Sequence, residues 1–391
     1  MNTVLGENMQ CKRCLNEDRE WFYKGSKGWY CRKCIAFGRA MVEEEEESVS
    51  LCEITSGAYE YQLKYPLTPA QENVAYALRE AILQDDVLVQ AVCGAGKTEI
   101  VIPTIASFLR QHKKVCFAIP RRQVVLEVAE RLQTYFNTAK VIAVCGGHTD
   151  VVDGDLIVCT THQLYRYAPK GIDLLILDEP DAFPYRNNEV LFGISKAVRK
   201  GHCVYLTATP DAYLKNEIQE GRVICLKLNV RPHGKPIPVP RVIKCPMGIG
   251  LCFLIRWLFA HKQHPRIVFV PTIRMSVIIG RFLNLFLHCS ICSSKTENRD
   301  AVIEGFRKEG NGILIATTVM ERGVTIPHAD VCVLQANHSV FDEAGLVQMA
   351  GRAGRDFQDP TGDVLFLCTE ECEMVNACVQ ALEEANLSCG V

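Results

Sequence analysis

The sequence has almost no net charge and no hydrophobic run long enough to cross a membrane. Its 43 lysines and arginines nearly balance its 45 aspartates and glutamates, so the formal net charge is −2. A chain-wide basic field for a polyanion is therefore excluded, and any nucleic-acid surface must be a local cleft. The apolar stretch GIGLCFLIRWLFA is interrupted by Arg256 and is too short to span a bilayer. We therefore expect a soluble protein that is not transmembrane.

A signal peptide and a regular disulfide framework are also missing, although the sequence contains 20 cysteines. Several cysteines stand alone in apolar runs such as KVCFAIP and LIVCTT, where free cysteine packs as a small hydrophobic residue. The pair Cys289 and Cys292 has no matching pair nearby, and we interpret it as part of a strand. This cysteine usage predicts a reducing, cytosolic environment.

The composition changes along the chain in a way that predicts two α/β domains behind a small N-terminal module. Short apolar runs alternate with amphipathic segments, which is typical of buried parallel strands joined by helices. The first linker begins with the acidic run EEEEE, and the second contains four prolines. The predicted boundaries are 1–42 for the module, 43–66 for the first linker, 67–228 for domain 1, 229–241 for the second linker and 242–391 for domain 2.

The stretch AVCGAGKTE follows a predicted strand and precedes an amphipathic helix. It matches the P-loop pattern GxxxxGK[ST] except that Ala91 replaces the first glycine. In such a loop the backbone N–H groups and the helix N-terminus surround phosphates. The lysine reaches the β- and γ-phosphates, and the hydroxyl that follows it binds Mg²⁺. The predicted contacts to MgATP are Gly94, Ala95, Gly96, Lys97 and Thr98.

The stretch LILDEPDAFPY ends another predicted buried strand with three carboxylates. In a P-loop ATPase, Asp178 would bind Mg²⁺ and Glu179 would orient the attacking water. Asp181 completes a DExD box and is expected to bond to Thr207 or Thr209 in the segment TAT, which couples hydrolysis to movement. The aromatic residues that follow the box have two interpretations: they wedge between the motor and DNA, or they pack in the core.

The second α/β domain carries QMAGRAGR, in which Arg352 and Arg355 are three residues apart. We expect both to act as arginine fingers on the γ-phosphate, with Gln348 as a coupling residue. The segment ATTVMERGVTIP contains Gly323, which we assign to the nucleotide site. Gln71 in YPLTPAQ stands where an adenine-reading glutamine belongs. Together these are motifs typical of helicase superfamily 2, in which two RecA-like lobes close on ATP.

Candidate DNA contacts follow the predicted strands of both domains. The hydroxyl and guanidinium side chains there could hold DNA phosphates, although the two arginines could equally be solvated. They are Arg121, Arg122, Thr161, Thr272 and Thr318.

The N-terminal module contains two cysteine pairs in the spacing C-x2-C-x16-C-x2-C. Two such paired thiolates suit a tetrahedral structural Zn²⁺, and a segment of this size could hardly fold on a core of its own. The predicted ligands are Cys11, Cys14, Cys31 and Cys34. Aromatic residues between the pairs either stack on bases or pack around the metal. They are Trp21, Phe22, Tyr23, Trp29 and Tyr30.

The module, LTPAQ, GAGKTE, DEPDAFPY, TATP and QMAGRAGR together resemble the ComFA family of DNA-uptake ATPases from naturally competent Gram-positive bacteria. DAFPY is the most specific part of the resemblance. It implies a cytoplasmic ATPase, peripheral at the inner face of the cell membrane, that contacts the channel for incoming DNA and is stimulated by single-stranded DNA. It also implies a ComFC-like partner related to phosphoribosyltransferases, and it leaves a homo-oligomer open.

We therefore expect an ATP-dependent single-stranded DNA translocase that drives uptake of transforming DNA. One alternative is a replication-restart or RNA helicase of superfamily 2, against which the N-terminal position of the module and the DAFPY motif argue. Another is a zinc-dependent DNA-binding scaffold with a vestigial ATPase. The intact Glu179 and both arginine fingers argue against the scaffold.

Overall fold

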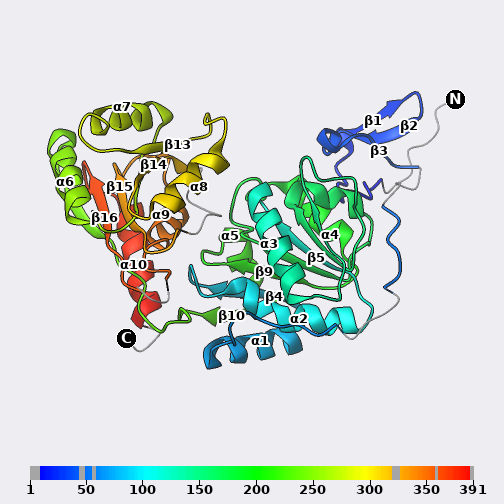
Figure 1. The fold of residues 1–391 in the computed structure, drawn as a ribbon. Coiled ribbons are helices and arrows are strands. Elements are labelled where there is room, and N and C mark those ends of the chain that lie inside the picture. The colour runs from blue at the N-terminus through cyan, green and yellow to red at the C-terminus, as the bar shows by residue number, and fades with distance from the viewer. Residues whose placement is uncertain (1–8, 44–48, 55–58, 319–325, 357–359, 388–391) are drawn as a thin grey trace. The chain divides into compact units, whose positions relative to one another are not determined.

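The computed structural model describes residues 9–43, 49–54, 59–318, 326–356 and 360–387. The chain divides into two compact units (Figure 1). The first unit comprises Met1–Ala91 and Lys97–Leu228, and the second comprises Val92–Gly96 and Asn229–Val391. Each unit contains its own parallel β-sheet, which confirms the predicted fold class of two tandem α/β domains.

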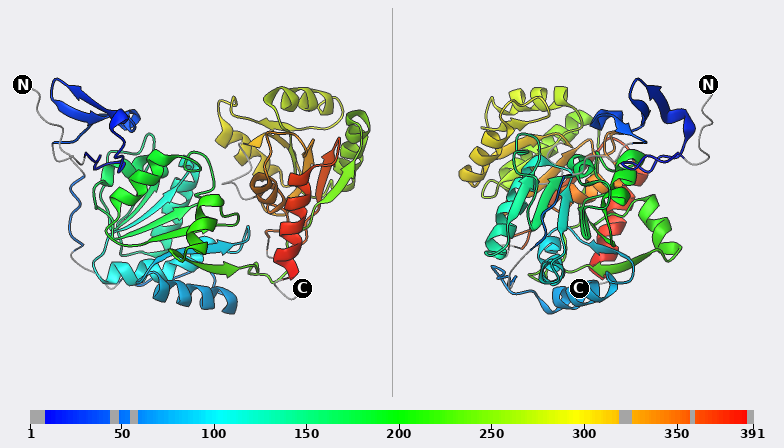
Figure 2. Two further views of the ribbon diagram at one scale, coloured as in Figure 1. Left: turned by 180° about the vertical axis from the view of Figure 1, so that it is seen from behind. Right: turned by 90° about the vertical axis from the view of Figure 1, so that its right-hand side faces the viewer.

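The first unit is built on a seven-stranded sheet in the order β10-β4-β9-β8-β5-β7-β6, and every neighbouring pair is parallel. Its strands are buried along most of their length because helices cover both faces, as the opposite views in Figures 1 and 2 show. The strands are β4 (Asp86–Ala91), β5 (Val115–Ile119), β6 (Val141–Val144), β7 (Leu156–Thr160), β8 (Leu174–Asp178), β9 (Cys203–Thr207) and β10 (Val223–Leu228).

Several helices of this unit begin at a residue whose side chain accepts a hydrogen bond from a free N–H group of the first turn. Thr68 and Gln71 form a capping box at the start of the first helix, and Asn188 accepts a bond from the Leu191 N–H at the start of the fourth. The helices are α1 (Pro69–Ala81), α2 (Lys97–Arg110), α3 (Arg122–Tyr135), α4 (Glu189–Val198), α5 (Ala212–Gln219) and the 3₁₀-helix η3 (Thr161–Tyr167).

The N-terminal module is a small antiparallel sheet of three strands that packs on α4 of the same unit. A Cβ atom at Gly193 would lie 1.8 Å from the carbonyl oxygen of Cys14, so only glycine allows this approach. At the rim, Lys33 Nζ lies 2.7 Å from a carboxylate oxygen of Glu189. The module contains η1 (Arg19–Trp21), β1 (Phe22–Gly25), β2 (Gly28–Cys31), η2 (Ile35–Phe37) and β3 (Ala40–Met41).

The second unit has a six-stranded parallel sheet in the order β11-β16-β15-β12-β14-β13. Alternate strand residues face two separate cores: α8, α9 and α10 cover one face, and α6 and α7 cover the other. The strands are β11 (Arg241–Lys244), β12 (Arg266–Phe269), β13 (Ser290–Cys292), β14 (Ile313–Ala316), β15 (Asp330–Leu334) and β16 (Val364–Cys368). The helices are α6 (Met247–Ala260), α7 (Ile273–Leu283), α8 (Arg299–Glu309), α9 (Glu343–Ala350) and α10 (Glu373–Leu387).

Across the described ranges, none of the helices has both the length and the apolar character that spanning a bilayer requires.

Candidate nucleotide site and metal centre

The predicted catalytic carboxylates of the first unit gather at one edge of its sheet. Strands β4, β9 and β8 are parallel neighbours, so their carboxyl ends meet at the same edge. β8 ends at Asp178, β9 ends at Thr207, and α2 begins with Lys97 soon after the end of β4. The carboxyl edge of a parallel α/β sheet is where such folds bind ligands.

The loop between β4 and α2 has the backbone geometry that a phosphate-binding turn requires. Gly94 and Gly96 have φ angles of +83° and +81°, a region that residues with a side chain rarely adopt. Lys97 opens α2, and its Nζ atom donates a 3.2 Å hydrogen bond to the carbonyl oxygen of Ala91. The lysine is therefore folded back over the end of β4, where a P-loop lysine meets phosphate oxygens.

The hydroxyl group predicted to bind Mg²⁺ has a neighbour that the sequence did not reveal. Arg131 of α3 donates a 3.0 Å hydrogen bond from Nη2 to Oγ1 of Thr98. The same guanidinium lies 3.5 Å from a carboxylate oxygen of Glu99. Arg131 thus adds positive charge beside the start of α2, and nothing in the local sequence of α3 marks it for that role.

The carboxylate of Asp178 lies in an environment that suits a ligand of a metal cation. Its Oδ1 atom is buried and has no hydrogen-bond partner within the described residues. Burial, together with the negative charge of Glu179, raises the pKa of Asp178 to about 7, while the Lys97 ammonium acts to lower it. A divalent cation would satisfy the orphaned oxygen and stabilise the ionised form, so these residues fit Mg²⁺.

The remaining members of the DExD box are fixed by the neighbouring strand. Glu179 has a left-handed backbone with φ of +50°, and its N–H donates to the carbonyl oxygen of Leu206 at 2.9 Å. Asp181 is buried and accepts hydrogen bonds from Thr207 Oγ1 at 2.5 Å and from Thr209 Oγ1 at 2.9 Å. The predicted bond between the box and the TAT segment is thus present in the structure with both threonines.

The two aromatic residues after the box, for which the sequence left two interpretations open, lie in different environments. Tyr185 is buried, its hydroxyl lies 2.8 Å from Ser195 Oγ, and its ring meets Phe192 edge-on at 4.7 Å. The wedge interpretation is therefore wrong for Tyr185. Phe183 is 88% exposed, so its ring is available on the surface and the wedge interpretation stays open for it.

Gln71 and the candidate DNA contacts of the first unit lie on separate elements. Gln71 is buried, and its Oε1 atom accepts a bond from the Thr68 N–H in the capping box. Arg121 precedes α3, and Arg122 donates from Nε to the carbonyl oxygen of Gly146 at 2.7 Å. Thr161 begins η3 with a buried side chain. The roles of these residues stay predictions.

The second unit carries the predicted arginine fingers directly after α9. Arg352 is buried, whereas Arg355 is half-buried and donates from Nε to the carbonyl oxygen of Gly351 at 2.8 Å. Gln348 is buried on α9, and its Oε1 atom accepts from Cys93 Sγ at 3.1 Å. Gly323 lies outside the described residues.

Arg231 is a buried cation in the predicted linker that our sequence analysis missed. Its guanidinium donates to the carbonyl oxygens of Gly351, Ala353 and Gly354 at 2.6–3.0 Å. Arg231 therefore holds the turn that carries the two predicted arginine fingers. The four prolines of segment 229–241 predicted an extended linker. Proline content does not indicate that one side chain of such a linker is buried and hydrogen-bonded.

The other candidate DNA contacts of this unit occupy two different loops. Thr272 is exposed and caps α7 by accepting from the Met275 N–H at 3.1 Å. Thr318 is half-buried in a turn after β14. Both follow strands as predicted, and their contact with DNA stays a prediction.

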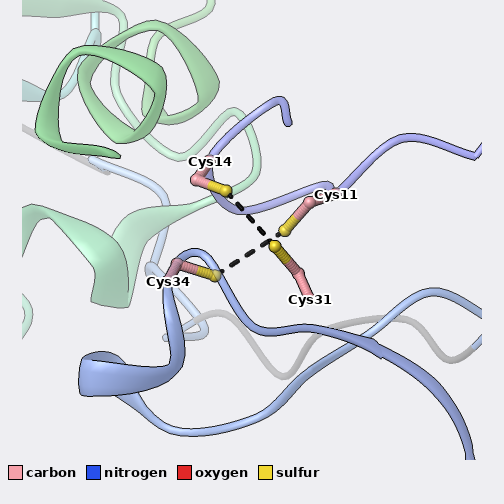
Figure 3. A group of neighbouring side chains, drawn as sticks. All are labelled: Cys11, Cys14, Cys31 and Cys34. Atoms are coloured by element: carbon pink, nitrogen blue, oxygen red, sulfur yellow. Dashed lines mark hydrogen bonds between the residues drawn. The ribbon is translucent and has the colours of Figure 1, made fainter. Parts of the chain in front are cut away.

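The four predicted metal ligands converge in the N-terminal module. Cys11 and Cys14 come from one loop, Cys31 and Cys34 from another, and their sulfur atoms point at a common centre (Figure 3). All four are buried, and the sulfur atoms lie within 4.8 Å of one another. Hydrogen bonds from the neighbouring thiols lower the pKa of Cys31. Four thiols in this arrangement fit a tetrahedral metal ion such as Zn²⁺.

The aromatic residues of the module divide between the two roles that the sequence left open. Phe22 is buried in the core that the module shares with the first unit. Trp21 and Tyr23 are exposed, and Arg32 lies over the Tyr23 ring at 6.0 Å. Packing therefore explains Phe22, while Trp21 and Tyr23 remain available for stacking on bases.

Comparison with known proteins first defines the class. Residues 68–216 match the DEAD/DEAH box helicase family, and residues 251–356 match the helicase conserved C-terminal domain. The structure of S. cerevisiae Dbp5 bound to RNA and ADP BeF3 shares the fold, with a TM-score of 0.62 and 17% identity over 82% of this chain and 92% of that chain. The protein is thus an ATP-hydrolysing, helicase-like enzyme of superfamily 2 with two RecA-like domains.

Two curated relatives then define the family. The competence protein ComFA of Bacillus subtilis is 37% identical over 386 residues, which cover 91% of this chain and 81% of the relative. The competence protein ComFA of Streptococcus pneumoniae is 33% identical and covers 97% of this chain and 91% of the relative. The chain belongs to the ComFA family, as the sequence motifs indicated.

Proposed function

We propose that this protein is a DNA-dependent ATPase that translocates along single-stranded DNA and drives transforming DNA into the cytoplasm during natural competence. The observation that carries the proposal is the arrangement at the carboxyl edge of the first sheet. There the orphaned oxygen of Asp178 lies among Lys97, Glu179 and the Asp181 link to TAT. A vestigial site would have no reason to keep a buried carboxylate that destabilises the protein without its cation.

In this proposal each residue at the site has one task in hydrolysis. Lys97 and the loop glycines hold the phosphates, and Thr98 and Asp178 hold Mg²⁺, which would neutralise charge that develops on the phosphate oxygens. Glu179 orients the attacking water and accepts its proton. Asp181 couples hydrolysis to movement of the TAT segment through its hydrogen bonds to Thr207 and Thr209.

The contacts outside this site also belong to the proposal. Gln71 and Gly323 contact the nucleotide. Arg352 and Arg355 stabilise charge on the γ-phosphate, and Gln348 couples hydrolysis to movement. The DNA backbone is held by Arg121, Arg122, Thr161, Thr272 and Thr318. The four cysteines bind one structural Zn²⁺.

We further propose where the protein works and with what. It acts at the inner face of the cell membrane, beside the channel that admits DNA, and binds a ComFC-like partner related to phosphoribosyltransferases. Membership of the ComFA family supports this proposal, because both relatives described above are named competence proteins.

The test is ATP turnover of the full chain with single-stranded DNA, duplex DNA and RNA in parallel. We expect single-stranded DNA to stimulate turnover most, with an affinity that falls linearly on a plot of log affinity against log salt. Glu179→Gln keeps the shape of the side chain and removes its charge, so nucleotide should still bind while turnover collapses. Equal stimulation by RNA would favour the RNA helicase alternative. Wild-type turnover in Glu179→Gln would refute the motor.

A further inference from the structure

The outer face of α6 and α7 in the second unit is apolar where a surface helix is normally polar. The side chain of Leu285, just after α7, is 80% exposed, and Ile278 and Ile249 are 55% and 52% exposed. We call this surface the α6–α7 face. Its apolar members are Ile249, Phe259, Ile278, Phe282, Leu285 and Phe286.

The two helices present these residues on the same side of the unit because both pack on the same face of the sheet. Leu254 and Trp257 of α6 and Ile279 and Leu283 of α7 are buried together in one core. The exposed residues lie on the opposite sides of their helices, away from the strands. Figure 1 shows α6 and α7 at the outer margin of the second unit, with no other helix drawn outside them in that unit.

Along the sequence, the segment that contains α6 and α7 carries charge of one sign. Between Glu220 and Glu297 the sequence contains no aspartate or glutamate but twelve lysines and arginines, although acidic residues outnumber basic ones in the whole chain. Arg256, Arg274 and Arg281 are exposed on the two helices. Among the described residues none of the three forms an ion pair with a carboxylate. A surface that combines projecting apolar side chains with unopposed arginines matches an anionic, partly apolar partner.

We propose that the α6–α7 face docks the protein on an anionic lipid bilayer. Leu285 and Ile278 would enter the boundary between headgroups and acyl chains, while Arg274 and Arg281 meet lipid phosphates. Exposed apolar side chains can enter a fluid lipid layer without a preformed pocket, and the exposed arginines beside them match lipid phosphates. This inference deepens the proposed action at the membrane and rests on it, but its test is independent of ATP hydrolysis.

The experiment is flotation of the full chain, without nucleotide or DNA, on phosphatidylcholine vesicles with and without phosphatidylglycerol. We expect binding only when the anionic lipid is present. Each arginine near such a surface strengthens binding about fivefold, so Arg274→Gln/Arg281→Gln should weaken it about 30-fold. Ile278→Gln/Leu285→Gln should weaken it at least tenfold, because the glutamine side chains cannot enter the acyl layer.

A matched control distinguishes binding through the α6–α7 face from nonspecific binding by exposed apolar side chains elsewhere. Tyr76→Gln/Leu83→Gln removes two exposed apolar side chains from the first unit and should leave vesicle binding unchanged. All variants should keep the wild-type melting temperature, because every substituted residue is exposed, and should keep ATP turnover with single-stranded DNA in vesicle-free solution.

Three outcomes would overturn the proposal. Wild-type protein that ignores anionic vesicles would assign the α6–α7 face to an acidic protein partner instead. Equal binding to neutral and anionic vesicles would remove the role of the arginines. Vesicle binding that survives both double substitutions would place the membrane contact elsewhere. Loss of DNA-stimulated turnover in the wild type would refute the proposed motor and leave the vesicle result standing.

Discussion

Asp178→Asn is the substitution that most directly tests the electrostatics of the nucleotide site. The carboxyl group lies at the end of β8, and its Oδ1 atom is buried without a hydrogen-bond partner among the described residues. Asparagine has the same shape and no charge to desolvate. We therefore expect the variant to be more stable than the wild type at neutral pH in the absence of nucleotide, although it should bind MgATP poorly.

The size and sign of the effect follow from the pKa. Burial raises the pKa of Asp178 from an ordinary 3.8 to about 7 in the folded protein. The folded state then holds its proton between pH 4 and 7 while the unfolded state has lost it, so stability falls as the pH rises through this window and is constant above it. A shift of about three pKa units corresponds to at most about 4 kcal/mol. The difference between variant and wild type should therefore grow from pH 4 to pH 7.

The assay is urea unfolding of the nucleotide-free protein between pH 5 and pH 8 with a chelator present. An Asp150→Asn variant serves as the control, because Asp150 is an exposed aspartate of the same unit. It should follow the wild-type profile. Parallel wild-type and Asp178→Asn profiles across this range would show that Asp178 is ionised without cost, and the argument would be refuted.

Further predictions concern the module, the metal and the nucleotide site. A Cβ atom at Gly193 would lie 1.8 Å from the nearest carbonyl oxygen, so Gly193→Ala should cost about 1–3 kcal/mol in urea unfolding, whereas Gly305→Ala has open space and should cost nothing. Cys31→Ala should abolish bound zinc in elemental analysis and leave DNA-free ATP turnover intact. Lys97→Ala should weaken nucleotide binding itself. Arg355→Ala should preserve binding and slow turnover by roughly 10³-fold or more.

Each of these predictions has an outcome that would contradict it. Unchanged stability of Gly193→Ala would mean that the module does not pack on α4. Full zinc content in Cys31→Ala would remove that cysteine from the ligand set. Wild-type turnover in Arg355→Ala would assign the turn after α9 a structural task, for which Arg231 already provides the hydrogen bonds.

The parts of the site that local sequence encodes could be predicted from it. A glycine-rich loop between a buried strand and a helix, and carboxylates at the end of a buried strand, are specified by neighbouring residues. The bond between Asp181 and the TAT segment was also expected, because Asp181 completes a DExD box and TAT follows another predicted strand. The structure shows that pair at 2.5 Å for Thr207.

The parts that depend on distant contacts could not be predicted. Arg131 reaches Thr98 from another helix, and Arg231 is buried among carbonyl groups that lie far along the chain. Arginine is usually a surface residue, so the residues around Arg231 in the sequence give no sign that its side chain is buried. The packing of Cys14 against Gly193 is equally hidden, because a glycine inside a helix looks like a weak point until its neighbour is known.

The stretch DAFPY shows how one short segment can serve both the site and the fold. Asp181 and Tyr185 are each buried and each hydrogen-bonded, Asp181 to the end of β9 and Tyr185 to Ser195 on α4. The backbone between these two anchors is held at both ends, whereas the Phe183 ring between them is 88% exposed. Glu179 lies on the other side of Asp181, in a left-handed conformation that the neighbouring strand supports through Leu206. Because Asp181 is bonded to Thr207 and Tyr185 to Ser195, this segment ties the carboxyl edge of the sheet to α4 of the same unit.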